Sequence, residues 1–232
     1  MEQLYIALDF QSADQVERFL KKLAPHRPAV KIGMELYYAE GPAFVRHLVS
    51  QGHDVFLDLK VHDIPETARR TMRVIGQLGV ELTNVHAAGG KAMMQAALEG
   101  LRETSTDTRL IAVTQLTSTD QDMLTDLMIP HAMNDVVVHY AHEAEHAGLD
   151  GVVCSALDTA HIKVICRSGF ELVTPGIRPN GTDANDQKRI ATVTDARRNG
   201  ATDLVIGRAI TQAEDPKVIY EALLSEWKGI KQ

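Results

Sequence analysis

Cysteine, basic charge and long hydrophobic runs are all scarce in this chain. Only Cys154 and Cys166 occur among the 232 residues, and their spacing suits neither a zinc knuckle nor a disulfide framework. We therefore expect two reduced, buried thiols and a cytoplasmic location. No apolar run approaches the length that spans a membrane, and the first residues lack the basic segment of a signal peptide. The sequence predicts no membrane partner.

Negative charge outnumbers positive charge. Lys and Arg number 24 and Asp and Glu number 31, which gives a formal net charge of -7. Nucleic-acid affinity needs a basic face, so we predict no nucleic-acid partner, although a local cationic pocket for a small anion is compatible with this charge. No Pro-, Gly- or Ser-rich linker divides the chain, and 44% of its residues are hydrophobic. Residues 1–232 are therefore expected to form one domain around one core.

Short apolar segments rich in β-branched residues recur along the chain, and most precede a segment of helical periodicity. Eight occur, near residues 4–9, 29–33, 54–60, 81–87, 109–116, 151–155, 171–176 and 203–208. Alternating strands and helices form parallel sheets, and eight units in a chain of this length fit a barrel better than a doubly wound sheet. No Gly-x-Gly-x-x-Gly motif follows the first segment. The sequence predicts an α/β fold, a single-domain (β/α)8 TIM barrel.

The end of the third predicted strand carries charges of both signs, in Asp58, Lys60 and Asp63. Side chains alternate across a strand, so Asp58 and Lys60 should share a face, with Asp63 converging on them from the following turn. Flanking carboxylates favour the charged ammonium, which makes Lys60 a candidate proton donor rather than a Schiff-base lysine. Asp63 has a second interpretation, as a helix N-cap with Glu66 completing a capping box. Both interpretations of Asp63 stay open here.

Barrel enzymes collect functional groups at the carboxyl ends of their strands, and polar residues recur at those positions in this chain. They are Asp9, Lys31, Asp58, Lys60, His86, Thr117, Ser118, Ser155, Arg178 and Arg208. We interpret His86 and Ser155 as rim groups that bond to nearby backbone. The irregular segment 117–133 either caps the barrel mouth or packs on a partner subunit.

Two loops in the last third of the chain predict a phosphate site. The loop 176–187 is long and rich in turn-forming residues, carries Arg178 and Gln187, and is expected to act as a mobile lid. Gly207 and Arg208 follow the eighth strand, where these barrels commonly bind phosphate. Gly207 permits close approach of a ligand to the backbone, and Arg208 is the expected phosphate residue.

One motif that matches a metal site is interpreted as a coincidence. His142 and His146, with Glu143 between them, satisfy the zinc-protease pattern His-Glu-x-x-His. The inward stripe of that predicted helix includes Val137 and Ala141, which leaves both histidines on its outer, solvated side. With no third ligand in reach, we predict no metal site.

The candidate residues occur in motifs that resemble one enzyme family. The motifs are Asp58-x-Lys60-x-x-Asp63-Ile64-Pro65, Asp9 in 6–9, Lys31 in 30–35, Asn84-Val85-His86-Ala87, Leu116-Thr117-Ser118, Thr174-Pro175-Gly176-Ile177-Arg178 and Ile206-Gly207-Arg208. In this order and at these strand ends, they resemble the orotidine 5'-phosphate decarboxylase family over nearly the whole chain. The resemblance implies cofactor-free conversion of orotidine 5'-monophosphate (OMP) to UMP and CO2, the last step of de novo pyrimidine synthesis.

The resemblance also implies roles for individual residues. Lys60 donates the proton to C6 within an alternating network of Lys31, Asp58, Lys60 and Asp63. The substrate contacts that it implies are Asp9 and Lys31 to the ribose, Thr117 and Ser118 near the pyrimidine, Gln187 between base and phosphate, and Arg178, Gly207 and Arg208 to the phosphate. Asp63 and Thr67 reach the neighbouring subunit's site in a homodimer, and Ile64 and Pro65 of the same motif count among the substrate-binding residues.

Two alternative functions are compatible with the same barrel and charged residues. A magnesium-dependent sugar-phosphate decarboxylase or hexulose-phosphate synthase uses a similar barrel and a similar Asp-x-Lys-x-x-Asp motif. Its relatives tend to place a metal-binding glutamate where this chain has Lys31, and that difference favours the nucleotide. The second alternative is a non-catalytic barrel that binds a nucleotide phosphate, which intact Asp58 and Lys60 speak against.

Overall fold

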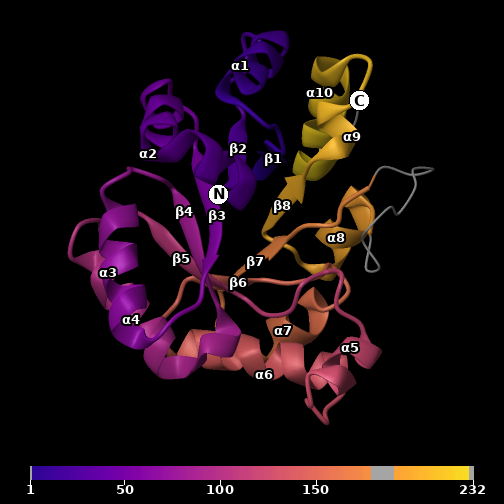
Figure 1. Cartoon of the computed structure of the whole chain (residues 1–232). Helices are drawn as coiled ribbons and strands as arrows, with labels where there is room; N and C mark the ends of the chain where they lie inside the picture. Colours follow the sequence, from indigo (N-terminus) through magenta and orange to yellow (C-terminus); the bar gives the residue numbers. More distant parts are fainter. Residues whose placement is uncertain (1, 179–190, 230–232) are drawn as a thin grey trace.

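The computed structural model describes residues 2–178 and 191–229, and its eight parallel strands close into a barrel in chain order. Figure 1 shows the helices surrounding this barrel. The strands are β1 (Leu4–Ala7), β2 (Ala29–Gly33), β3 (Val55–Val61), β4 (Leu82–His86), β5 (Arg109–Val113), β6 (Gly151–Val153), β7 (Glu171–Thr174) and β8 (Asp203–Ile206). The predicted (β/α)8 fold is confirmed. Several strands end one to three residues earlier than predicted, so polar residues such as Asp9 and Ser155 follow their strands and do not form the last strand positions.

Helices cover the outside of the barrel, and their apolar faces form the larger part of the core. They are α1 (Ala13–Lys22), α2 (Met34–Ser50), α3 (Pro65–Gly76), η1 (Ala87–Gly89), α4 (Gly90–Arg102), α5 (Gln121–Asp126), α6 (Met133–His146), α7 (Thr159–Ile165), α8 (Val193–Asn199), α9 (Arg208–Thr211) and α10 (Pro216–Lys228). Trp227 and Leu223 of α10 are buried in the same core as residues of the barrel strands. Within the described residues, no helix is long and apolar enough to cross a bilayer.

The middle of the barrel is a packed apolar layer rather than a pore. Its members are Tyr5, Ala7, Ala29, Phe56, Leu82, Ile111, Val173 and Val205, with Val153 packed against them. These side chains come from alternate positions of their strands, the pattern by which a closed barrel fills its interior. The layer separates a polar group at the amino ends of the strands from a charged cavity at their carboxyl ends.

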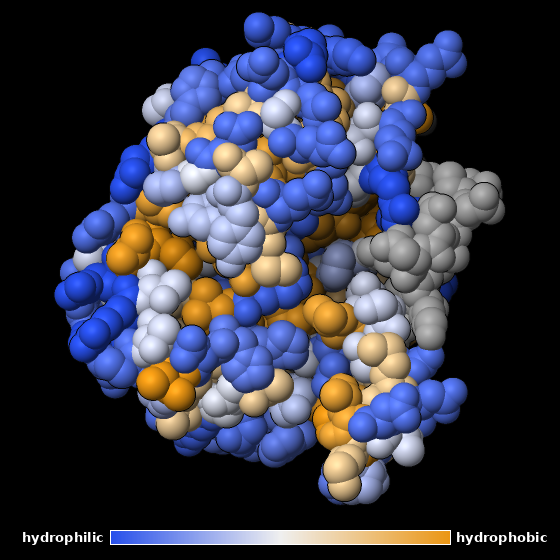
Figure 2. Space-filling view, in the orientation of Figure 1, coloured by the Kyte–Doolittle hydropathy of each residue, from blue (hydrophilic) through white to orange (hydrophobic). Residues whose placement is uncertain are grey.

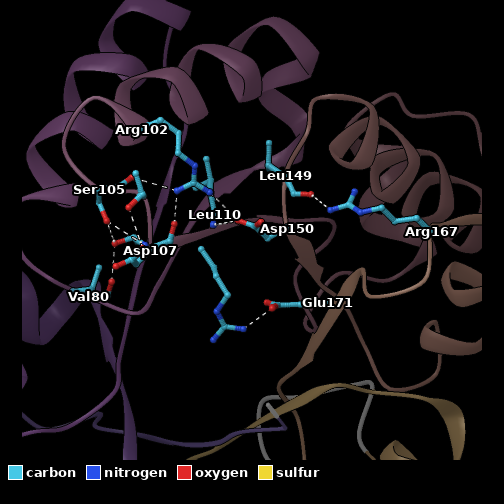
Figure 3. Close-up of polar contacts among 12 residues, drawn as sticks. Val80, Arg102, Ser105, Asp107, Leu110, Leu149, Asp150, Arg167 and Glu171 are labelled. Carbon is cyan, nitrogen blue, oxygen red and sulfur yellow. Dashed lines mark hydrogen bonds and ion pairs between the residues drawn. The ribbon is translucent and has the colours of Figure 1, made fainter.

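The polar group below this layer centres on Arg109, whose guanidinium donates to Glu171 (2.6 Å), Glu81 (2.9 Å) and the Tyr5 hydroxyl (2.9 Å). Burial, followed by the charges of Asp203 and Asp150, raises the pKa of Glu171 despite its contact with Arg109, and burial also raises the pKa of Asp203. Figure 3 shows Glu171 beside a second group of contacts, in which Arg102 reaches Asp150. Arg109 therefore compensates carboxylates that the barrel end partly buries.

We expect Arg109→Met to lower the free energy of unfolding by about 2–4 kcal/mol, because it leaves Glu81 and Glu171 without their cation. Without the cation, the carboxyl pKa values of the folded variant rise, and a raised pKa in the folded state lowers stability at pH values where the unfolded chain is ionised. The loss of unfolding free energy should therefore shrink as the pH is lowered and the carboxyl groups become protonated. Urea unfolding at two pH values measures both effects. Arg198→Met, which removes an exposed pair with Asp195, is the control and should change the stability much less. Equal losses of unfolding free energy in Arg109→Met and Arg198→Met would contradict the proposal that Arg109 compensates Glu81 and Glu171.

Three local expectations need correction. Helix α3 begins at Pro65 with Ile64 as its N-cap, so Asp63 is not the cap, and Glu66 pairs with arginines of its own helix rather than completing a capping box. The segment 117–133 is not wholly irregular, because Asp120 accepts a hydrogen bond from the Met123 N–H and starts α5. Neither thiol forms a disulfide, and Cys154 is buried whereas Cys166 is only partly buried.

The structure also shows where the segment 117–133 lies relative to the barrel mouth. Residues before the helix line the barrel mouth, whereas Met123, Leu127 and Met128 are exposed. Figure 2 shows hydrophobic atoms over the part of the surface where Figure 1 places α5. The beginning of the segment therefore forms part of the mouth, and its helical part projects outward.

Candidate active site

A cavity of about 660 Å³ opens at the carboxyl ends of the strands. Among the residues that line it are Asp9, Lys31, Asp58, Lys60, Thr117, Ser118, Arg178, Gly207 and Arg208. Segments from nearly every strand end therefore bring together side chains that are up to about two hundred residues apart in sequence. The predicted clustering of these residues is confirmed. Gln187 and most of the expected lid loop lie outside the described residues.

Charges of alternating sign run across the floor of this cavity. Lys31 Nζ lies 3.3 Å from Asp9 Oδ1 and 3.6 Å from Asp58 Oδ2. Lys60 Nζ donates to the other oxygen, Asp58 Oδ1, at 2.8 Å. Asp58 is 9% exposed, so both of its oxygens meet a cation in a largely desolvated position.

The protonation of Asp58 follows from these contacts. Burial alone would raise the pKa of this carboxyl, but the ammonium groups of Lys31 and Lys60, with hydrogen bonds from Lys60 and Asn84, outweigh burial and lower it. Asp58 is therefore a carboxylate at neutral pH. A buried carboxylate holds the Lys60 ammonium in one place, where it faces the cavity as a fixed positive charge.

Strand alternation is not what turns Lys60 toward Asp58. Lys60 has φ 51°, in the left-handed region, and the pairing of β3 with β4 shifts register between Leu57 and Val61. The prediction that Asp58 and Lys60 lie together is confirmed, but the cause is a bulge in β3. Backbone strain of this kind concentrates at functional sites.

Asn84 has a role in this site that its place in the motif Asn84-Val85-His86-Ala87 did not predict. This side chain is fully buried and bonds both to the backbone of Lys60 and to the carboxylate of Asp58. A usable signal was present, because asparagine is depleted in strands and a buried amide must find partners.

The two rim residues behave as the sequence predicts. Ser155 is buried and its hydroxyl accepts from the Leu157 N–H at 3.2 Å. His86 accepts from the Ala88 N–H at 3.4 Å and stacks on His62, with ring centroids 5.6 Å apart. Burial, and then the proximity of His62 and Lys60, lowers the pKa of His86, so its ring is neutral at neutral pH.

Two arginines stand at the end of the cavity near β7 and β8. Arg178 is 7% exposed and donates to the Ile177 carbonyl at 3.0 Å. Arg208 begins α9 directly after Gly207, and all three of Arg178, Gly207 and Arg208 line the cavity. Two guanidinium groups at one end of a concave site suit an anion such as a phosphate.

Asp63 does not join the charge network within one chain, which corrects the predicted convergence. Its side chain is exposed and accepts from the Ile64 N–H at 2.7 Å. Asp63 and Thr67 instead line a second depression, of about 490 Å³, which also touches Lys60. Asp63 lies in the short connection between Val61, where β3 ends, and Pro65, where α3 begins.

The histidine motif on α6 is directed away from the cavity. The His142 side chain is 47% exposed, and His146 Nδ1 lies 2.8 Å from the His142 carbonyl oxygen. Within residues 2–178 and 191–229, no three histidine, cysteine or carboxylate side chains are grouped so as to hold a metal ion.

The fold and this cavity define a (β/α)8-barrel enzyme whose site accepts a small anionic substrate. The chain belongs to the orotidine 5'-phosphate decarboxylase / HUMPS family, whose sequence profile matches residues 2–223. Orotidine 5'-phosphate decarboxylase of Streptococcus mutans is 53% identical over 226 residues, covering 97% of each chain, and that of Streptococcus suis is 51% identical over 224 residues, covering 96% of each.

Solved structures agree with this assignment. Orotidine 5'-phosphate decarboxylase from Lactobacillus acidophilus superposes with a TM-score of 0.89 at 38% identity, covering 98% of this chain and 99% of its own. A conserved protein from Geobacillus kaustophilus gives a TM-score of 0.86 at 47% identity, covering 97% of this chain and 99% of its own. The likeness therefore extends over the whole barrel.

Proposed function

We propose that this protein decarboxylates OMP to UMP and CO2, the last step of de novo pyrimidine synthesis, without metal or organic cofactor. One observation carries the proposal: the Lys60 ammonium is held at 2.8 Å by the buried Asp58 carboxylate inside the cavity. Relatives of about 50% identity are named for this activity, which supports the same conclusion.

The chemistry demands a fixed cation. Loss of CO2 from C6 of the pyrimidine leaves an electron pair in the plane of the ring, where the π-system cannot delocalise it. A positive charge already in place stabilises that pair without reorganisation. Lys60 then transfers one proton to C6, which forms the C–H bond of UMP and leaves a neutral amine. Asp58 positions Lys60, and its negative charge beside the substrate carboxylate would favour departure of CO2.

The remaining cavity residues are proposed to bind the rest of the nucleotide. Arg178, Gly207 and Arg208 hold the phosphate, and Asp9 with Lys31 holds the ribose hydroxyls, since these residues line one cavity and carry the charges that each group needs. Thr117 and Ser118 lie beside the pyrimidine, and Gln187 joins base and phosphate. Phosphate contacts far from C6 contribute binding energy that orients the reacting ring.

We further propose that the working unit is a homodimer in which Asp63 and Thr67 complete the neighbour's site. Both line the outer depression next to Lys60, so a second copy seated there would face the reacting group. Exposed apolar side chains surround it, including Ile64 (67% exposed), Tyr38 (75%) and Val74 (52%). Pro65 starts α3 at this edge and sets the direction of the loop.

A cytoplasmic location is part of the same proposal. Neither Cys154 nor Cys166 forms a disulfide, which suits a reducing compartment. Activity that copurifies with the cytoplasmic fraction of a producing cell would support it, and activity confined to another fraction would oppose it.

The first experiment follows OMP by its ultraviolet absorbance after the protein has been treated with a chelator. We expect full conversion to UMP, unchanged when Mg²⁺ is added, because the charge at C6 is met by Lys60 rather than by a metal.

Two other results would contradict the proposed function and favour an alternative. Activity that is lost with EDTA and restored by Mg²⁺ would favour the magnesium-dependent sugar-phosphate decarboxylase or hexulose-phosphate synthase branch. UMP binding without turnover would favour a non-catalytic nucleotide-binding barrel. A sugar phosphate assayed in parallel is the control that separates the first of these from an inactive preparation.

A further inference from the structure

The bulge in β3 leaves one residue of β4 opposite three residues of β3. Leu57 pairs with Thr83 and Val61 pairs with Val85, so 58, 59 and 60 face Asn84 alone. A bulge interrupts the hydrogen-bond ladder and leaves backbone groups without their usual partners. Lys60, the last of these β3 residues, also has φ 51°, in the left-handed region that residues other than glycine rarely adopt. Some other contact must therefore hold the lysine backbone in place.

The side-chain amide of Asn84 supplies that contact. Its Oδ1 accepts from the Lys60 backbone N–H at 2.8 Å, and its Nδ2 donates to Asp58 Oδ1 at 2.7 Å. The orientation of the amide follows from its partners, because an N–H needs an acceptor and a carboxylate needs a donor. Asn84 is 0% exposed, so water does not compete for either bond.

The contacts close a ring. Asp58 Oδ1, which accepts from Asn84, also accepts from Lys60 Nζ at 2.8 Å. The backbone of Lys60, the amide, the carboxylate and the ammonium are thus linked in sequence. A shift of the amide would move both ends of Lys60.

We propose that Asn84 is a positioning residue for the decarboxylation, which sets the place of Lys60 Nζ by holding the lysine backbone and its partner carboxylate at once. The inference rests on the proposed role of Lys60 as the proton donor. Asn84 lies behind the charge pair and acts through it, so its loss should lower kcat far more than it weakens nucleotide binding.

The test compares Asn84→Leu and Asn84→Asp with the wild type in OMP turnover and in binding of UMP. Asn84→Leu removes both hydrogen bonds at similar volume, and we expect kcat to fall by about 100-fold with UMP affinity within about fivefold. Asn84→Asp keeps the acceptor for Lys60 but places a second carboxylate against Asp58. Two such groups resist joint ionisation, so the acid limb of the kcat–pH profile should move to higher pH.

Thr83→Val is the matched control. Thr83 is also fully buried on β4 and its hydroxyl donates to the Leu57 carbonyl at 3.0 Å, and within the described part of the chain it makes no hydrogen bond to Asp58 or Lys60. We expect it to lose a buried hydrogen bond and stability yet keep kcat within about twofold.

The outcomes separate the two proposals. An equal loss of kcat in Asn84→Leu and Thr83→Val, or an acid limb that does not move in Asn84→Asp, overturns the positioning role. If Asn84→Leu does not fold, the pH profile of Asn84→Asp decides alone. A wild-type protein that fails to convert OMP refutes the proposed function itself, which is a different result from active wild type with unaffected Asn84 variants.

Discussion

Lys60→Ala is expected to lose OMP decarboxylation by at least about 10⁴-fold while UMP still binds within about tenfold. General acid catalysis and electrostatic stabilisation each contribute factors of 10² or more, and one ammonium supplies both. The residues proposed to bind phosphate and ribose also line the cavity and keep their side chains in this variant, so affinity for the product should survive. Single-turnover absorbance measurements and UMP titration measure the two quantities.

Folding must be checked in the same variant, because Asp58 loses its closest cation. Lys31 remains 3.6 Å from Asp58 Oδ2 and should keep the carboxylate paired. Urea unfolding should therefore show a reduced unfolding free energy in a variant that is still folded. Lys22→Ala, at an exposed position in the last turn of α1, is the control and should match the wild type in both assays. A folded Lys60→Ala protein that turns over OMP at an appreciable rate would end the proton-donor assignment.

Mixing inactive Lys60→Ala subunits with inactive Asp63→Asn subunits should restore activity, to about one quarter of wild type. Random exchange makes half of the dimers mixed, and a mixed dimer with shared sites has one site with native Lys60 and native Asp63. The outer depression that contains Asp63 and borders Lys60 is the reason to expect sharing. The measurement is the specific activity after partial denaturation and refolding of the mixture.

The control mixes Lys60→Ala with Asp58→Asn. These two residues bond to each other within one chain, so every site of a mixed dimer lacks one of them and no activity should return. Rescue in the control, or none in the test mixture once subunit exchange has been demonstrated, contradicts the shared site.

Much of the fold was determined by local sequence. Apolar β-branched segments at regular spacing predicted eight strands, and the chain forms those eight in order around one barrel. Polar residues at strand ends predicted the mouth, and Asp9, Lys31 and Arg208 all line its cavity. These predictions succeeded because strand periodicity and the parallel barrel place the end of every strand on one rim.

Other features depended on contacts between strands. The pairing of Glu81, Arg109 and Glu171 below the apolar layer joins residues from three strand starts, and spacing along the chain does not reveal it. The capping interpretation of Asp63 was wrong for a related reason, since both interpretations fit its local sequence equally well. Only the folded chain shows that Asp63 lies outside the cavity.

The sequence by itself determined the barrel, the identity of the charged residues and the rim on which they gather. The tertiary structure decided how they are arranged: the bulge of β3 against β4, the left-handed backbone of Lys60, and the amide of Asn84 between Lys60 and Asp58. Strand and helix periods are local properties of the chain. Register, burial and hydrogen bonding between distant residues arise only when the barrel closes, because closure brings together groups that no local pattern relates.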